Sequence, residues 1–144
     1  YPPALDKIKE SDIIIIGPGS LYTSIIPNLS INDITKAINE SKACKIYVCN
    51  IATQIGETKG YSMEDHIQSL QKHTIPDIVD YVLANNNLRR LDERFFGEPV
   101  INKNKKLNNV QIIESDIGDE NHPIRHDSHK LTENIIKLYE KHHI

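Results

Sequence analysis

The sequence feature that most constrains the fold is a run of four isoleucines, Ile13 to Ile16, that leads directly into a Gly-Pro-Gly-Ser segment. An uninterrupted β-branched run is typical of a strand buried on both faces, as in a parallel sheet covered by helices. Glycines at the carboxyl end of such a strand allow a sharp turn with exposed backbone amides. Because ligands of open α/β sheets bind at this edge, we expect an anionic or polar ligand to face Gly17 to Ser24. The alternative is an ordinary strand-to-helix turn.

Strand and helix patterns then alternate along the chain. Apolar residues at helical spacing mark the helices, and short β-branched runs mark the strands. In chain order we predict strand 12–17, short helix 20–26, helix 30–40, strand 45–50, helix 62–73, strand 80–85, short helix 88–96, an extended piece at 99–101, strand 110–115 and helix 127–141. Alternation of this kind predicts an α/β fold, here a three-layer α/β/α Rossmann-like architecture with a mainly parallel sheet.

Three of the predicted helices carry capping signals at their amino termini. Ser30 with Asp33 and Ser62 with Asp65 each place an acidic residue three positions after a serine, a variant of the capping box. Asp127 is a suitable N-cap for the last helix. These local signals predict where the helices begin.

Composition bounds the class of protein. The chain has 144 residues, which fits a single α/β domain over 1–144, and a net charge of −3 with scattered basic residues, which disfavours nucleic-acid binding. The longest apolar run has four residues, against about 18 needed to span a membrane, so we expect no membrane association. Cys44 and Cys49 do not form a disulfide framework, and we interpret them as reduced, structural thiols of a cytoplasmic protein.

If the sheet is parallel, three strand ends meet at one edge: the Gly17–Ser20 turn, Asn50 with its loop, and Asn85. Glycine amides, hydroxyls and side-chain amides then surround one crevice, which can bind a phosphate, a ribose or a sugar without a positive side chain. The turn lacks the lysine of a P-loop and the third glycine of a dinucleotide fingerprint. Glu57 is the one carboxylate of the middle loop, and we expect it to be solvated. This set is better suited to recognition than to proton transfer.

A histidine-rich segment invites a metal hypothesis. His122, His126, Asp127 and His129 lie within eight residues. Because Asp127 is more simply explained as a helix cap and zinc ligands must converge, we predict no metal site here.

Four segments of the chain resemble the gluconeogenesis factor (YvcK-like) branch of the CofD-like superfamily. They are SDIIIIGPGSLYTSIIPNL at 11–29, KIYVCNIATQIGETKGY at 45–61, DYVLANN at 80–86 and IRHD at 124–127. The family's amino-terminal glycine-rich loop has no counterpart here, so the resemblance implies the C-terminal part of a longer chain. It also implies a bacterial cytoplasmic protein with a Rossmann-like fold.

The resemblance implies a regulatory protein that binds nucleotide sugars such as UDP-N-acetylglucosamine and supports cell shape and wall synthesis during gluconeogenic growth. The alternative it implies is a transferase that moves a phospholactyl-type group from a nucleotide diphosphate carrier to a hydroxyl, with Mg²⁺. In that branch the first motif reads closer to Pro-Ser-Asn-Pro, which disfavours the reaction here. No cofactor is evident otherwise, no catalytic residue is assigned, and a homo-oligomer is left open. The expected ligand-binding residues are Gly17, Pro18, Gly19, Ser20, Leu21, Tyr22, Thr23, Asn50, Gln54, Glu57 and Thr58.

Overall fold

The strands form one parallel sheet, as predicted. A computed structural model describes residues 1–89, 91 and 93–143. Its sheet has four strands in the order β1-β2-β3-β4, all neighbours parallel: β1 (Ile13–Ile16), β2 (Cys44–Val48), β3 (Tyr81–Asn85) and β4 (Gln111–Ser115). The carboxyl ends of all four strands therefore meet at one edge of the sheet.

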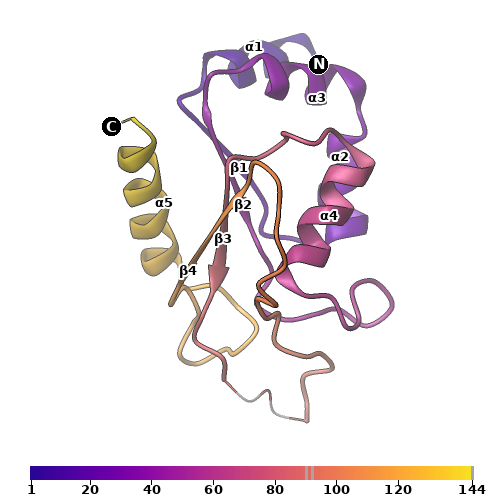
Figure 1. Ribbon diagram of the computed structural model, residues 1–144, viewed down its shortest axis with the longest axis vertical. Helices are drawn as coiled ribbons and strands as arrows, with labels where there is room; N and C mark the ends of the chain where they lie inside the picture. The colour runs from indigo at the N-terminus through magenta and orange to yellow at the C-terminus, as the bar shows by residue number, and fades with distance from the viewer. Residues whose placement is uncertain (90, 92, 144) are drawn as a thin grey trace.

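Helices cover both faces of this sheet, which gives the predicted three layers. They are α1 (Pro2–Glu10), a π-helical turn η1 (Leu21–Ile25), α2 (Ile26–Leu29), α3 (Asn32–Glu40), α4 (Met63–His73) and α5 (Ser128–His142). Helix α5 lies alone on one face, and α2 and α4 lie on the other (Figure 1). Helices α1 and α3 pack together near the edge where the strands begin. No described helix has the length and apolar character needed to cross a membrane.

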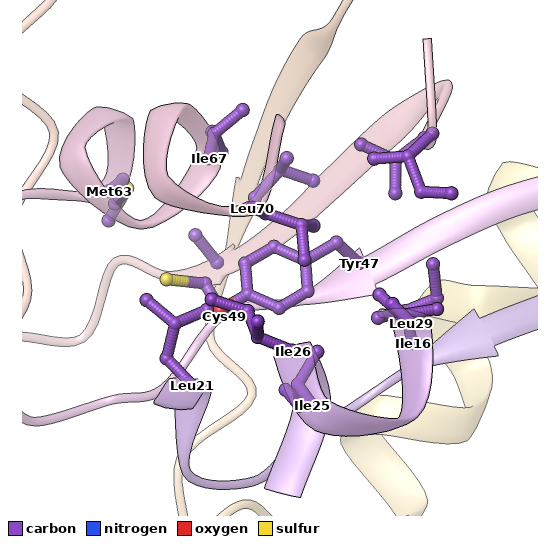
Figure 2. Packing of buried hydrophobic residues seen from close by; sticks show 14 of the residues in the cluster. Ile16, Leu21, Ile25, Ile26, Leu29, Tyr47, Cys49, Met63, Ile67 and Leu70 are labelled. Carbon is purple, nitrogen blue, oxygen red and sulfur yellow. The ribbon is translucent and has the colours of Figure 1, made fainter. Parts of the chain in front are cut away.

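The hydrophobic core has two parts, one on each face of the sheet, because successive side chains of a strand point to opposite faces. On β2, Tyr47 faces the α4 side, while Cys44 and Ile46 face α5. The Tyr47 ring is fully buried among side chains of η1, α2 and α4, with Leu70 and Ile26 beside it (Figure 2). Alternate side chains point to opposite faces of a strand, so a continuous apolar run serves both layers at once.

The isoleucine run itself forms the outermost strand on one side of the sheet. Strand β1 pairs only with β2 among the described strands, and Ile15 keeps 48% of its surface exposed. The prediction that this strand is buried on both faces is therefore wrong for Ile15. Composition indicates a buried strand, but the order of strands in the sheet decides which one lies at the edge.

Two local predictions after β1 also need correction. The predicted helix 20–26 is a π-helical turn that continues into α2, whose first turn accommodates Pro27. Ser30 does not cap α3, because its hydroxyl donates to the Ile26 carbonyl at 2.8 Å and Ile31 occupies the N-cap position. A serine between two helices can donate to a carbonyl of the preceding helix instead of accepting from an N–H of the following one.

The other two capping predictions are confirmed. The Ser62 hydroxyl accepts from the Asp65 N–H and the Asp65 carboxylate accepts from the Ser62 N–H, a complete capping box for α4. The Asp127 carboxylate accepts from the Lys130 N–H and caps α5.

The predicted helix over 88–96 is wrong for the part of that segment that the structure describes, which is irregular with a turn at 93–94 and a bend at 95. Residues 90 and 92 lie outside the described residues. Leu88 and Phe96 are exposed, so neither of these side chains packs on the sheet. The extended piece at 99–101 is present, and Pro99 forms an antiparallel bridge with Ala52.

Candidate functional site

The turn after β1 is shaped by two glycines with different roles. Gly17 has φ of +86°, and a Cβ there would lie 3.0 Å from the Val48 carbonyl oxygen, so only glycine fits comfortably. The following Gly17–Pro18 peptide bond is cis. Gly19 has no such restriction, and a Cβ there would meet only Ser24 and Ile25 at 3.6 and 3.8 Å. Gly17 therefore makes the turn, while Gly19 leaves an open backbone next to it.

The loop after β2 reaches across to this turn. The Gln54 side-chain amide donates to the Ser20 hydroxyl at 3.0 Å. The Gln54 backbone is held by Thr58, whose buried hydroxyl accepts from the Gln54 N–H at 2.9 Å. Thr58 is thus a positioning residue, and the two loops are joined directly across the crevice.

A segment distant in sequence forms the third wall. The Thr53 N–H donates to the Glu98 carbonyl at 2.8 Å, and the Glu98 N–H donates to the Thr53 hydroxyl at 2.9 Å. Gly97 packs so closely that a Cβ there would lie 2.4 Å from the Thr53 carbonyl oxygen. These contacts hold residues 94–97 against the loop after β2.

The loop before α5 supplies the fourth wall. His126 Nε2 lies 3.1 Å from the Cys49 carbonyl oxygen, which can only accept, so the N–H of the neutral ring is on Nε2 and Nδ1 is an acceptor. Burial lowers the pKa of His126, and the bond to the Cys49 carbonyl opposes that effect only in part. A neutral imidazole therefore faces the crevice at pH 7.

Together these walls enclose an open cavity of about 910 Å³ at the carboxyl ends of β1 and β2. This volume is in the range of small-molecule sites. The lining residues are Pro18, Gly19, Ser20, Asn50, Ile51, Ala52, Thr53, Gln54, Ile55, Arg94, Phe95, Phe96, Gly97, Ile124, Arg125 and His126. Figure 1 shows the carboxyl ends of the strands at the end of the sheet marked by the arrowhead of β3.

Five of the residues predicted from the sequence line this cavity: Pro18, Gly19, Ser20, Asn50 and Gln54. Their role in ligand binding stays a prediction. Gly17 and Thr58 lie behind the lining and shape it, as described above.

The other four predicted residues lie away from the cavity. Leu21 is fully buried in the core, and Thr23 is exposed outside the lining. The Tyr22 hydroxyl lies 2.8 Å from that of Tyr61 and points toward α4. Glu57 also lies outside the lining, and its Oε2 is buried without a hydrogen-bond partner in the described residues, so the expected solvation is wrong for that oxygen.

Sequence reasoning missed the residues contributed by distant segments, namely Arg94, Phe96 and Arg125. The nearest signal for Arg125 was the motif at 124–127, which follows a strand whose carboxyl end lies at the same edge. No local pattern indicated Arg94 or Phe96, because the Thr53–Glu98 contact that places them is not local.

The charge of the cavity differs from the neutral site expected. Two guanidinium groups lie in its lining, and none of the described lining residues is an aspartate or glutamate. Amides, hydroxyls and arginines form a set that favours an anion bearing polar hydroxyls. Of the four residues of the metal hypothesis, His126 is the one in the described lining, and Asp127 caps α5 as expected.

Comparison with known proteins identifies the family. The family described as 2-phospho-L-lactate transferase CofD matches residues 1–144. The chain belongs to the CofD family. A relative from Thermoanaerobacterium thermosulfurigenes is 44% identical over 95% of this chain and 45% of its own length. The gluconeogenesis factor of Bacillus subtilis is 37% identical over 95% of this chain and 46% of its own length.

A solved structure shares the fold of this chain. The crystal structure of a UPF0052 family member from Bacillus halodurans aligns with a TM-score of 0.85 at 37% identity, over 94% of this chain and 46% of that one. The chain thus spans less than half the length of the relatives it matches.

Proposed function

We propose that the protein is a gluconeogenesis factor whose crevice binds a nucleotide sugar of the UDP-N-acetylglucosamine type. The observation that carries this proposal is the lining of the crevice, which combines an open glycine backbone, neutral hydrogen-bond donors and two arginines with no described carboxylate. This mixture of donors suits a diphosphate that links two sugars.

Each part of such a ligand has a matching feature in the crevice. Backbone amides at Gly19 and Ser20 and the guanidinium of Arg125 suit the diphosphate oxygens. The side-chain amides of Asn50 and Gln54 suit ribose and sugar hydroxyls. Phe96 keeps 79% of its surface exposed at the rim, and an aromatic face of this kind can stack on a nucleobase.

The biological role that we propose follows the relatives rather than the geometry. The matched Bacillus subtilis protein is named a gluconeogenesis factor. We place this protein in the same role, as a cytoplasmic regulator of cell shape and wall synthesis on gluconeogenic carbon sources. Binding of a wall precursor would report its supply to that regulator.

Transfer of a phosphorus-containing group is the second candidate, since the matched family carries a transferase's name. Phosphoryl-type transfer with Mg²⁺ relies on carboxylates that hold the metal. The described lining residues offer none, and the neutral His126 is the only described titratable group in the lining other than the arginines. The lining therefore favours binding as the function of this chain.

Isothermal titration of the intact protein with UDP-N-acetylglucosamine tests the proposal. We expect saturable binding by the wild type, and a loss of about tenfold or more in affinity for Arg125→Ala, because one charge-assisted contact contributes roughly 1.5–3 kcal/mol. Lys137→Ala, an exposed change on α5 outside the cavity, is the matched control and should bind as the wild type does. Absence of heat at millimolar ligand contradicts the proposal, and equal losses in both variants would show a nonspecific charge effect.

A further inference from the structure

A second cluster of reactive side chains lies at the opposite edge of the sheet, where the strands begin. Cys44 is the first residue of β2, Asp80 immediately precedes β3, and His142 belongs to the last turn of α5. One ligand atom from each lies within 4.8 Å of the other two. We propose that Cys44, Asp80 and His142 bind a zinc-class transition-metal ion that fastens the end of α5 to the sheet.

The donor set selects this class of metal. A thiolate, an imidazole and a carboxylate are the ligands that Zn²⁺ and its neighbours prefer, whereas Mg²⁺ and Ca²⁺ take oxygen ligands. Three protein ligands leave the fourth tetrahedral position to water. Zinc–ligand distances of about 2.0–2.3 Å put tetrahedral ligand atoms about 3.5 Å apart, so the cluster must contract by about 1 Å. His142 lies at the surface at the end of a helix and can make this movement.

The surroundings hold two of the ligands in place. One Asp80 oxygen accepts from the Lys45 N–H at 2.9 Å, which orients the carboxylate and leaves its other oxygen for a metal. The His142 ring lies edge-on to the Tyr81 ring at 5.7 Å, with Nδ1 3.4 Å from the Tyr81 hydroxyl. Hydrogen bonds to ligand side chains of this kind are typical of metal sites.

The Asp80 carboxylate brings a negative charge to the cluster. A thiol that coordinates a bound dication is deprotonated by it, so Cys44 would bind as the thiolate. Cys49 is also buried and reduced but belongs to no such cluster in the described residues, so it provides a matched comparison.

The site would act on the crevice only through α5. Its ligands lie at the edge where the strands begin, whereas the crevice lies at their carboxyl ends. Because α5 follows directly on the loop that carries Arg125 and His126, metal binding would stabilise the helix behind that wall. The proposal does not rest on the identity of the crevice ligand.

Titration of the intact, metal-free protein with Co²⁺ alone tests the site, because a cobalt–thiolate bond absorbs in the near ultraviolet. We expect this absorption for the wild type, for Cys49→Ser and for His143→Ala, and its displacement by Zn²⁺. Cys44→Ser should lose the absorption, and His142→Ala should weaken Co²⁺ binding by at least about tenfold. Absence of the band in the wild type overturns the proposal, as does its retention in Cys44→Ser or unchanged affinity in His142→Ala.

A thermal measurement keeps the test independent of the buried thiol. His142 lies at the surface, so His142→Ala should fold. At Zn²⁺ concentrations about 100-fold above Kd, we expect the Tm of the wild type and of His143→Ala to rise by roughly 5 °C or more. The Tm of His142→Ala should not rise, and an equal rise in all three proteins overturns the proposed ligand set.

Discussion

Replacing Gly17 with alanine tests how the turn after β1 is built. The residue has φ of +86°, which costs an L-residue about 1–2 kcal/mol. The new Cβ would also lie 3.0 Å from the Val48 carbonyl oxygen and 3.2 Å from Ile25 Cδ1, and relieving this crowding costs about 1–2 kcal/mol more. We therefore expect Gly17→Ala to lower the free energy of unfolding by about 2–4 kcal/mol.

Two other glycines separate the contributions. Gly56 has φ of +83°, and a Cβ there would meet nothing within 4 Å, so Gly56→Ala should show only the conformational cost of about 1–2 kcal/mol. Gly19 has ordinary contacts at 3.6 and 3.8 Å, so Gly19→Ala should leave stability within about 0.5 kcal/mol of the wild type. Urea denaturation followed by circular dichroism gives all three values. A Gly17→Ala effect no larger than that of Gly56→Ala would refute the argument from the Val48 carbonyl.

Three further predictions concern the helices and the long connection. Burial raises the pKa of Asp65, but hydrogen bonds from Ser62 and Lys105 outweigh it and hold the pKa at about 2, below the reference value of 3.8. The stability advantage of the wild type over Asp65→Asn should therefore be complete above pH 4 and disappear as the pH falls through about 2. Urea denaturation measures this advantage, and a difference that does not depend on pH contradicts the prediction. Asp127→Ala removes the cap of α5 and should cost about 1 kcal/mol, whereas Asp127→Asn should retain most of it; equal losses would contradict a capping role. The fully buried Glu64 carboxylate accepts hydrogen bonds from the backbone N–H groups of Lys103 and Lys105. Glu64→Ala should therefore destabilise the protein by about 1–3 kcal/mol and expose residues 99–106 to limited proteolysis, and unchanged cleavage would contradict this.

The sequence was informative where the determining interactions are local. The capping box of Ser62 and Asp65 and the cap at Asp127 each involve residues within one helical turn, and both are present. The strand–helix alternation likewise predicted a parallel sheet whose strand ends meet at one edge. The prediction that Ser30 caps α3 was wrong because the Ile26 carbonyl, an acceptor equally close in sequence, takes the serine hydroxyl.

The parts that the sequence did not reveal depend on distant contacts. Ile15 is half exposed because β1 is at the edge of the sheet, a property of strand order rather than of the isoleucine run. Arg94 and Phe96 reach the crevice because Thr53 and Glu98 bond to one another across 45 residues. A single sequence gives no measure of such pairings, so the walls formed by residues 94–97 and 124–126 were assigned only once the fold was known.

The position of a bound nucleotide sugar tests the central claim most directly. In a crystal structure of the intact protein with UDP-N-acetylglucosamine, we predict the diphosphate beside Gly19 and Ser20, with the guanidinium of Arg125 within hydrogen-bond distance of its oxygens. Density for the ligand at any other place in the molecule, with the crevice at the ends of β1 and β2 left empty, would contradict the account.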